Sequence, residues 1–239
     1  MSANEKVYDP MDSLLVSFTA GENAWKQRWW TKKGVTSPDH ARQVPIRKAS
    51  GQMLRLVQCV FLAPATLAPR RVMFCGIDEN NSSEVCASAG RVLAEQTGAD
   101  VCLVDANMRD RRLSKLFDLD HRRQSQGGPA SWGEQCVSVD KNLFVAGTGI
   151  LEGSDYRLAS ARELRDRITA LSITFEYLLI DAPGVNTSSE TGVLGQVAGS
   201  AVLVLEANST RRVEAKRAKE TLQMANIRIL GTVLDNHSQ

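Results

Sequence analysis

Residues 74–98 read FCGIDENNSSEVCASAGRVLAEQTG, in which a short apolar strand passes through a polar loop into a helix. A segment of this kind occupies the place of a phosphate-binding loop, whose pattern is G-x-x-x-x-G-K-[ST]. When that pattern begins at Gly76, Asn81 falls on the second glycine, Ser82 on the lysine and Ser83 on the hydroxyl residue. The segment therefore has the position of a phosphate-binding loop without most of its residues.

The missing residues carry the chemistry of such a loop. The glycine lets backbone amides close around the phosphates, and the lysine reaches the outer two. Here the loop supplies the carboxylates of Asp78, Glu79 and Glu84, and one carboxylate ~4 Å from a phosphate charge costs a few kcal/mol. Asn81 and Glu84 also fit a capping box, which would satisfy the helix amides internally. Taken alone, the segment fits a plain strand-to-helix turn at least as well as a lost nucleotide loop.

Length and composition bound the other possibilities. The 239 residues suit one large α/β domain with an irregular extension, and the net charge of +2 favours no partner class. The five cysteines show no C-x-x-C spacing, which favours a reducing cytosol. The start has no basic region leading into an apolar core, and no run approaches the ~18 apolar residues of a membrane span. We expect a cytoplasmic protein whose membrane contact is peripheral or through a partner.

The chain changes character near residue 49. Residues 1–48 are polar and contain three of the seven prolines, so they predict a partly helical extension. Trp25 and Trp29 would share one face of a helix there, among basic residues. Such a face docks on a membrane surface or a partner, or equally clamps onto its own domain.

Residues 49–239 alternate between strand and helix patterns. The predicted strands are Val72–Gly76, Val101–Asp105, Leu143–Ala146, Tyr177–Asp181, Ala201–Leu205 and Ile229–Leu234. The predicted helices are Ser83–Gln96, Arg112–Phe117, Ala159–Leu171, Glu190–Val197 and Arg212–Met224. Continuous apolar strands separated by amphipathic helices predict a doubly wound α/β fold, with a mostly parallel sheet covered on both faces.

Two of the predicted strands end in aspartate, at Asp105 and Asp181. In an open parallel sheet the carboxyl ends of the strands line the ligand crevice. A carboxylate there can hold Mg²⁺ beside a nucleotide, directly or through water. Two such aspartates, each followed by turn residues, favour a metal–nucleotide site more than either does alone.

At this point the sequence resembles a known family, the bacterial tyrosine kinases of capsule and exopolysaccharide synthesis, of the CpsD/CapB type. This family lies within the MinD/ParA group of P-loop ATPases. VCLVDANMRDRRLSKLFDL (residues 101–119) is similar to the family's second Walker segment, and FEYLLIDAPGV (175–185) to its Walker B strand. KNLFVAGTG (141–149) matches the family's strand that precedes the helix leading into Walker B. ILGTVLDN (229–236) is similar to the family's last strand. The resemblance covers about residues 49–236 and also places Ser82 at the lysine position.

The sequence departs from the family pattern in the metal-binding segments, in the oligomerisation helix and in the C-terminal segment that is phosphorylated. The D-x-D of the second Walker segment becomes Asp105-Ala106-Asn107, which loses one carboxylate. Gly184 stands at the second proline after Walker B, and Glu190 at a later aspartate. In the family's oligomerisation helix, E-x-x-R-x-x-R, only Arg55 matches. The C-terminal tyrosine cluster that the family phosphorylates has no counterpart here.

The resemblance and these departures lead to one favoured function. We expect a degenerate, non-catalytic or impaired kinase-like protein that regulates or scaffolds exopolysaccharide synthesis and export. It would bind no cofactor and lie at the inner face of the plasma membrane. There it would dock on a membrane polysaccharide co-polymerase, or chain-length protein, through Trp25, Trp29 and Arg55. A homo-oligomer is possible in this family, and no nucleic acid is expected.

The alternative is an active ATP-dependent autokinase or a MinD/ParA-like ATPase. It would hold Mg-ATP with Asp105 and Asp181, and Arg109, Arg111 or Arg112 would supply the positive charge that the loop lacks. In that case the remaining loop residues Gly76, Asn81, Ser82 and Ser83 would still face the nucleotide.

Overall fold

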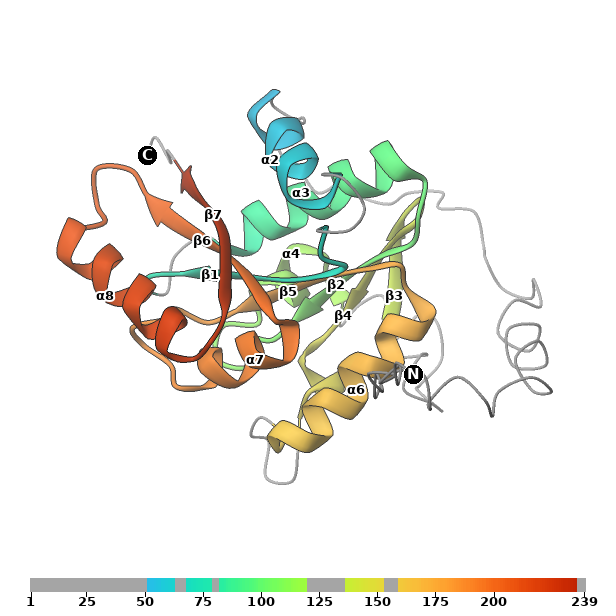
Figure 1. Ribbon diagram of the computed structural model, residues 1–239. Helices are drawn as coiled ribbons and strands as arrows, with labels where there is room; N and C mark the ends of the chain where they lie inside the picture. Colours follow the sequence, from blue (N-terminus) through green and yellow to red (C-terminus); the bar gives the residue numbers. More distant parts are fainter. Residues whose placement is uncertain (1–50, 63–67, 79–81, 120–135, 153–158, 236–239) are drawn as a thin grey trace, which may run out of the picture. The chain divides into compact units, whose positions relative to one another are not determined.

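The computed structural model describes residues 51–62, 68–78, 82–119, 136–152 and 159–235 (Figure 1). The partly helical extension expected at residues 1–48 lies outside these residues. The division of the chain at residues 48 and 49 therefore stays a prediction.

The described strands form a single seven-stranded sheet (Figure 1). Its order is β3-β4-β2-β5-β1-β6-β7, and every neighbouring pair is parallel except β3 and β4. The strands are β1 (Arg71–Gly76), β2 (Val101–Asp105), β3 (Cys136–Asp140), β4 (Leu143–Ala146), β5 (Tyr177–Ala182), β6 (Ser200–Glu206) and β7 (Arg228–Asp235). The predicted mostly parallel sheet is confirmed.

Helices cover both faces of this sheet (Figure 1). They are α2 (Gly51–Phe61), α3 (Ser82–Thr97), α4 (Arg112–Leu116), the short 3-10 helix η3 (Thr148–Ile150), α6 (Ala161–Thr174), α7 (Glu190–Ala198) and α8 (Arg212–Met224). The buried residues of α2, α3 and α4 join one core cluster, and those of α6, α7 and α8 join another. The sheet thus separates two apolar layers.

Strand β1 shows why the inner strands read as continuous apolar runs. Val72 and Phe74 belong to the core on the α3 side, and Met73 and Cys75 to the core on the α7 side. Successive side chains of a strand point to opposite faces, so a strand covered on both faces needs an apolar residue at every position.

The five cysteines are free thiols. Cys75, Cys86 and Cys102 are fully buried. Burial raises the pKa of Cys75 to about 12, and it also raises the pKa of Cys86 and Cys102 well above the ordinary value. Cys136 is half-buried at the start of β3, and Cys59 is exposed on α2.

Two of the differences from the sequence prediction have a clear physical cause. Strand β3 was not predicted, because CVSVD is short and alternates with polar residues at one edge of the sheet. Helix α6 begins at Ala161 rather than at residue 159, because Ser160 caps it. The amide of Glu163 donates to the Ser160 hydroxyl (3.3 Å), and the Ser160 amide donates to the Glu163 carboxylate (2.9 Å). The helix then continues to Thr174, past the predicted end at residue 171.

Replacing this cap tests its contribution to stability. Ser160→Ala should lower the free energy of unfolding by about 1 kcal/mol, because it removes the acceptor for a helix amide. Ser172→Ala is the control within the same helix: its hydroxyl donates to the Ile168 carbonyl, which already accepts within the helix. Urea denaturation should therefore show a loss for Ser160→Ala and little change for Ser172→Ala. Equal losses in the two variants would contradict the assignment.

Candidate functional site

The two strand-end aspartates lie side by side in the middle of the sheet. Asp105 and Asp181 are register partners across β2 and β5, and both are completely buried. The backbone continues this link, because the amide of Ala106 donates to the carbonyl of Asp181 (2.9 Å). The topology thus brings together two residues that are 76 positions apart in the sequence.

Asp181 is held by the start of helix α3. The hydroxyl of Ser82 donates to Oδ1 (2.9 Å), and that of Ser83 donates to Oδ2 (2.5 Å). Burial raises the pKa of Asp181 to about 7, and the charge of Asp105 adds to this, while the two serine hydrogen bonds and Arg112 lower it. The carboxyl therefore exchanges its proton near neutral pH.

Asp105 is held by helix α4 in a similar way. Ser114 donates to Oδ2 with both its amide (2.8 Å) and its hydroxyl (2.6 Å), and the amide of Asn107 donates to Oδ1 (3.3 Å). Burial raises the pKa of Asp105, while these hydrogen bonds and the positive charge of Arg111 lower it. Ser114 was not predicted as a site residue, because a serine inside a short amphipathic helix carries no sequence signal for such a contact.

The hydrogen-bonding capacity of both carboxylates is met by groups of the protein itself. Each of the four carboxylate oxygens accepts at least one hydrogen bond from the chain. Serine hydroxyls and carboxylates are ligands that suit Mg²⁺. Within the described ranges, no three His, Cys, Asp or Glu side chains group as a metal site. In the described structure the chain's own hydrogen bonds thus occupy the carboxylate oxygens that a cation would use.

The loop after β5 is joined to the loop after β1. Two backbone hydrogen bonds connect them, from the amide of Val185 to the carbonyl of Gly76 (3.0 Å) and from that of Asn186 to that of Ile77 (2.9 Å). A Cβ at Gly184 would stand 2.2 Å from the carbonyl oxygen of Asp78. Only glycine permits this approach, so the residue that replaces the family's proline lets the two loops meet.

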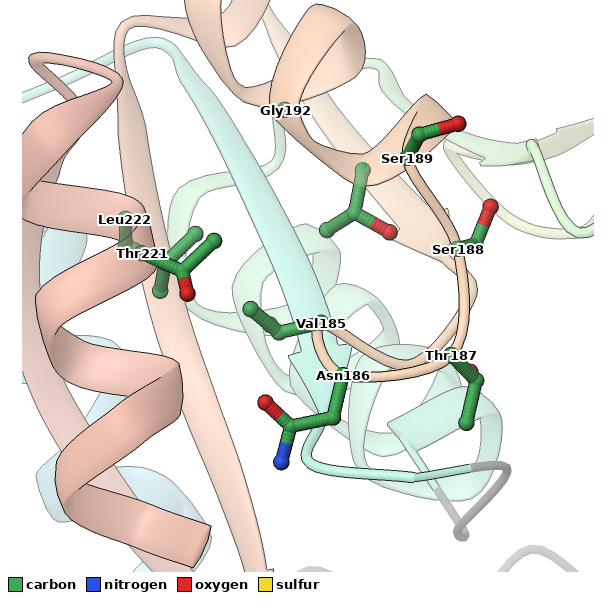
Figure 2. Close-up of a pocket in the computed structure, with 9 residues that line it drawn as sticks. Val185, Asn186, Thr187, Ser188, Ser189, Gly192, Thr221 and Leu222 are labelled. Carbon is green, nitrogen blue, oxygen red and sulfur yellow. The ribbon is translucent and has the colours of Figure 1, made fainter.

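A small pocket lies beside this junction (Figure 2), and neither Asp105 nor Asp181 is among the residues that line it. It has a volume of about 250 Å³ and lies between the loop after β5, the first turn of α7 and helix α8. Many of the side chains that line it carry hydroxyls: Thr187, Ser188, Ser189, Thr191 and Thr221. The volume is below the ~300 Å³ at which ligand pockets usually begin.

The other predicted site residues are placed as follows. Gly76 is the last residue of β1, while Asn81, Trp25 and Trp29 lie outside the described residues. Arg55 is exposed on α2, where the opposite face packs against α3 through buried apolar residues such as Val57. The structure brings Ser82 and Ser83 to Asp181, and it leaves Arg55 at the surface.

The sequence of this chain is similar to those of several bacterial tyrosine-protein kinases. No protein-family profile matches the chain. It is 27% identical over 157 residues to "Tyrosine-protein kinase YwqD" of Bacillus subtilis, a match that spans 64% of this chain and 66% of that protein. It is 21% identical over 208 residues to "Putative tyrosine-protein kinase CapB" of Staphylococcus aureus, spanning 85% and 91%. The resemblance to the bacterial tyrosine-protein kinases is confirmed.

Three solved structures illustrate the fold that this chain shares. The chimerical protein CapA2B2 aligns with a TM-score of 0.63 at 18% identity, covering 78% of this chain and 83% of that one. The kinase domain of the Escherichia coli tyrosine kinase ETK aligns at 0.57 and 17%, covering 71% and 70%. The MinC:MinD complex of Aquifex aeolicus aligns at 0.54 and 15%, covering 70% and 69%. The fold is that of the P-loop NTPases.

None of the helices in the described part of the chain is both long enough and apolar enough to cross a bilayer.

The raised pKa of Asp181 predicts how stability depends on pH. Between pH 4 and 7 the folded protein keeps a proton that the unfolded chain, with a pKa of 3.8, has released. Stability should therefore fall as the pH rises through this window, by at most about 4 kcal/mol from Asp181. In Asp181→Asn this contribution is absent, so the decline should be shallower.

Urea denaturation at a series of pH values measures this effect. Asp118→Asn, at an exposed aspartate in a loop, is the matched control and should keep the wild-type slope. If Asp181→Asn has the same slope as the wild type, the buried carboxyl does not titrate in this window.

Proposed function

We propose that the protein is a non-catalytic, or catalytically impaired, kinase-like regulator or scaffold of exopolysaccharide synthesis and export. Its relatives named above are tyrosine-protein kinases, and its fold is theirs. The chain lacks the lysine of the nucleotide loop, and a serine stands at that position. In this proposal the fold serves protein contact rather than phosphoryl transfer.

One observation carries the proposal, namely the hydrogen bond from Ser82 to Asp181. At this position a lysine would point outward to neutralise phosphate charge. The serine instead turns inward and satisfies the carboxyl at the end of β5. The residue therefore stabilises the joint between α3 and the sheet, and it supplies no positive charge for a phosphate. Asp78 and Glu84 remain near the loop as negative charges.

The partner that we propose is a membrane polysaccharide co-polymerase, at the inner face of the plasma membrane. The proposed contacts are Arg55 on the exposed side of α2, together with Trp25 and Trp29 of the N-terminal extension. Helix α2 suits this role because it buries Val57, Val60 and Phe61 against the domain while it exposes Arg55 and Gln58. The outer face of α2 is therefore exposed, while its inner face holds the helix in place on the domain.

A second candidate function is an active Mg-ATP enzyme, and one observation favours it. The positive charges of Arg111 and Arg112 act on Asp105 and Asp181 respectively, so cations do lie near the carboxylates. Arg112, however, forms an ion pair with Asp110 (3.1 Å). This contact holds its guanidinium close to its own loop. We therefore place this reading second.

Nucleotide binding separates the two functions. We expect the wild type to bind Mg-ATP with a dissociation constant in the millimolar range or weaker, about 4 kcal/mol of binding at most. The reason is that the loop lacks its lysine and second glycine. Isothermal titration calorimetry with and without Mg²⁺ measures this. The double variant Asn81→Gly with Ser82→Lys is the comparison, and it should bind more tightly. Micromolar binding by the wild type would contradict the proposal.

The docking surface is tested by substitution on α2 and in the extension. Arg55→Ala, or Trp25→Ala together with Trp29→Ala, should weaken capture by a membrane co-polymerase by ~2 kcal/mol, about 30-fold. The protein should stay folded by circular dichroism, because Arg55 is exposed. Gln58→Ala, an exposed position on the same helix, is the control and should bind normally. If every variant co-purifies as the wild type does, docking occurs elsewhere.

A further inference from the structure

The pocket between the loop after β5, the first turn of α7 and helix α8 has room for more than a single water molecule (Figure 2). Its volume is about 250 Å³, whereas one water molecule takes up ~30 Å³ of the liquid. The described residues that line it carry no ionisable side chain, because they are serines, threonines, an asparagine, a glycine, a valine and a leucine. The pocket is therefore polar but uncharged.

One polar atom in this pocket accepts no hydrogen bond from the described part of the chain. It is the side-chain oxygen Oδ1 of Asn186, which is buried. Figure 2 shows the amide of Asn186 turned toward helix α8, where Thr221 and Leu222 lie. The residue itself is fixed in place, because its backbone amide donates to the carbonyl of Ile77 (2.9 Å). Buried oxygens are usually paired, so this atom predicts a donor that a ligand would bring.

The hydroxyls of the pocket show which other groups such a ligand needs. Those of Thr187, Thr191 and Thr221 donate to backbone carbonyls at 3.2, 2.9 and 3.0 Å, respectively. A hydroxyl has one proton and two lone pairs, so each of these three oxygens can still accept. The hydroxyl of Ser188 accepts from the amide of Glu190 (3.2 Å) and keeps its own proton to donate. A matching ligand therefore donates several hydrogen bonds and also accepts.

Gly192, the third residue of α7, lines the pocket without filling it. A Cβ at this position would meet no atom within 4 Å, and the backbone is not in the left-handed region. Gly195 in the same helix differs, because a Cβ there would stand 2.3 Å from the side chain of Ile227. Glycine weakens a helix relative to alanine. Packing thus requires the glycine at 195 but not at 192, where the missing side chain leaves the pocket its room.

We propose that this pocket binds a small neutral molecule rich in hydroxyls, namely a single sugar ring or a cyclic polyol. Hydroxyls both donate and accept, so they match the oxygen of Asn186, the threonine oxygens and the proton of Ser188. A charged ligand would leave water without gaining an ionic partner. Val185 and Leu222 would contact the C–H groups of the ring. The site is separate from the strand-end carboxylates and from the α2 surface, so it does not depend on the function proposed above.

Titration of the full chain with matched small molecules tests the ligand class. The neutral probes are glucose and myo-inositol. The charged probes are glucosamine and glucuronate, which carry an ammonium or a carboxylate on the same ring. Two-dimensional ¹H–¹⁵N NMR with up to roughly 50 mM of each probe covers a millimolar dissociation constant. We expect at least one neutral probe to give saturable shifts at residues 185–192 and 221–222, and to bind about tenfold more tightly than either charged probe.

Three variants connect this binding to the pocket. Gly192→Leu should abolish it by filling the space, and the protein should stay folded because leucine is the better helix former. Asn186→Ala should weaken it about tenfold, because one acceptor is lost. Gln223→Ala removes a carboxamide from an exposed position of α8 that does not line the pocket. This control should bind as the wild type does.

Four results would overturn the proposal. They are the absence of saturable shifts with both neutral probes, shifts that map to another part of the chain, equal or tighter binding of a charged probe, and unchanged binding by Gly192→Leu. The dispersion of the same NMR spectra shows whether each variant is folded.

Discussion

The structure depends on the buried carboxyl of Asp181 and the two serine hydroxyls that hold it. An isolated buried carboxylate is costly unless it is paired, hydrogen-bonded or protonated. Ser82 and Ser83 reduce this cost, and in doing so they fix the start of helix α3 to strand β5. Strand β5 lies between β2 and β1 and pairs with both. The helix is therefore attached near the centre of the sheet.

The same contact attaches the first turn of helix α3 to the sheet through groups of the chain itself. Here the chain provides the order itself, through the serines on Asp181, Ser114 on Asp105 and the backbone bonds between the loops after β1 and β5. Internal hydrogen bonds of this kind are compatible with a role in protein contact, which requires a stable surface and no ligand.

Much of this arrangement could be predicted from the sequence. The apolar runs of the inner strands located these strands to within one residue, because a strand that is buried on both faces needs apolar side chains at nearly every position. Asp105 and Asp181 were predicted to share the strand-end edge, and they are register partners. Strand β3 was missed because an edge strand lacks that composition. The contact of Ser114 with Asp105 and the approach of Gly184 to Asp78 depend on chain packing, for which no local pattern exists.

The burial of the cysteines has a practical consequence for measurement. Maleimides react with thiolates that solvent can reach, and three of the five thiols are buried with a raised pKa. Of the five, only Cys59 is exposed, and it lies one turn of helix α2 beyond Arg55. The native chain thus carries a handle for a fluorophore on its outer helix. The emission of such a dye would change when another molecule binds at the exposed face of α2. No cysteine would have to be introduced for this measurement.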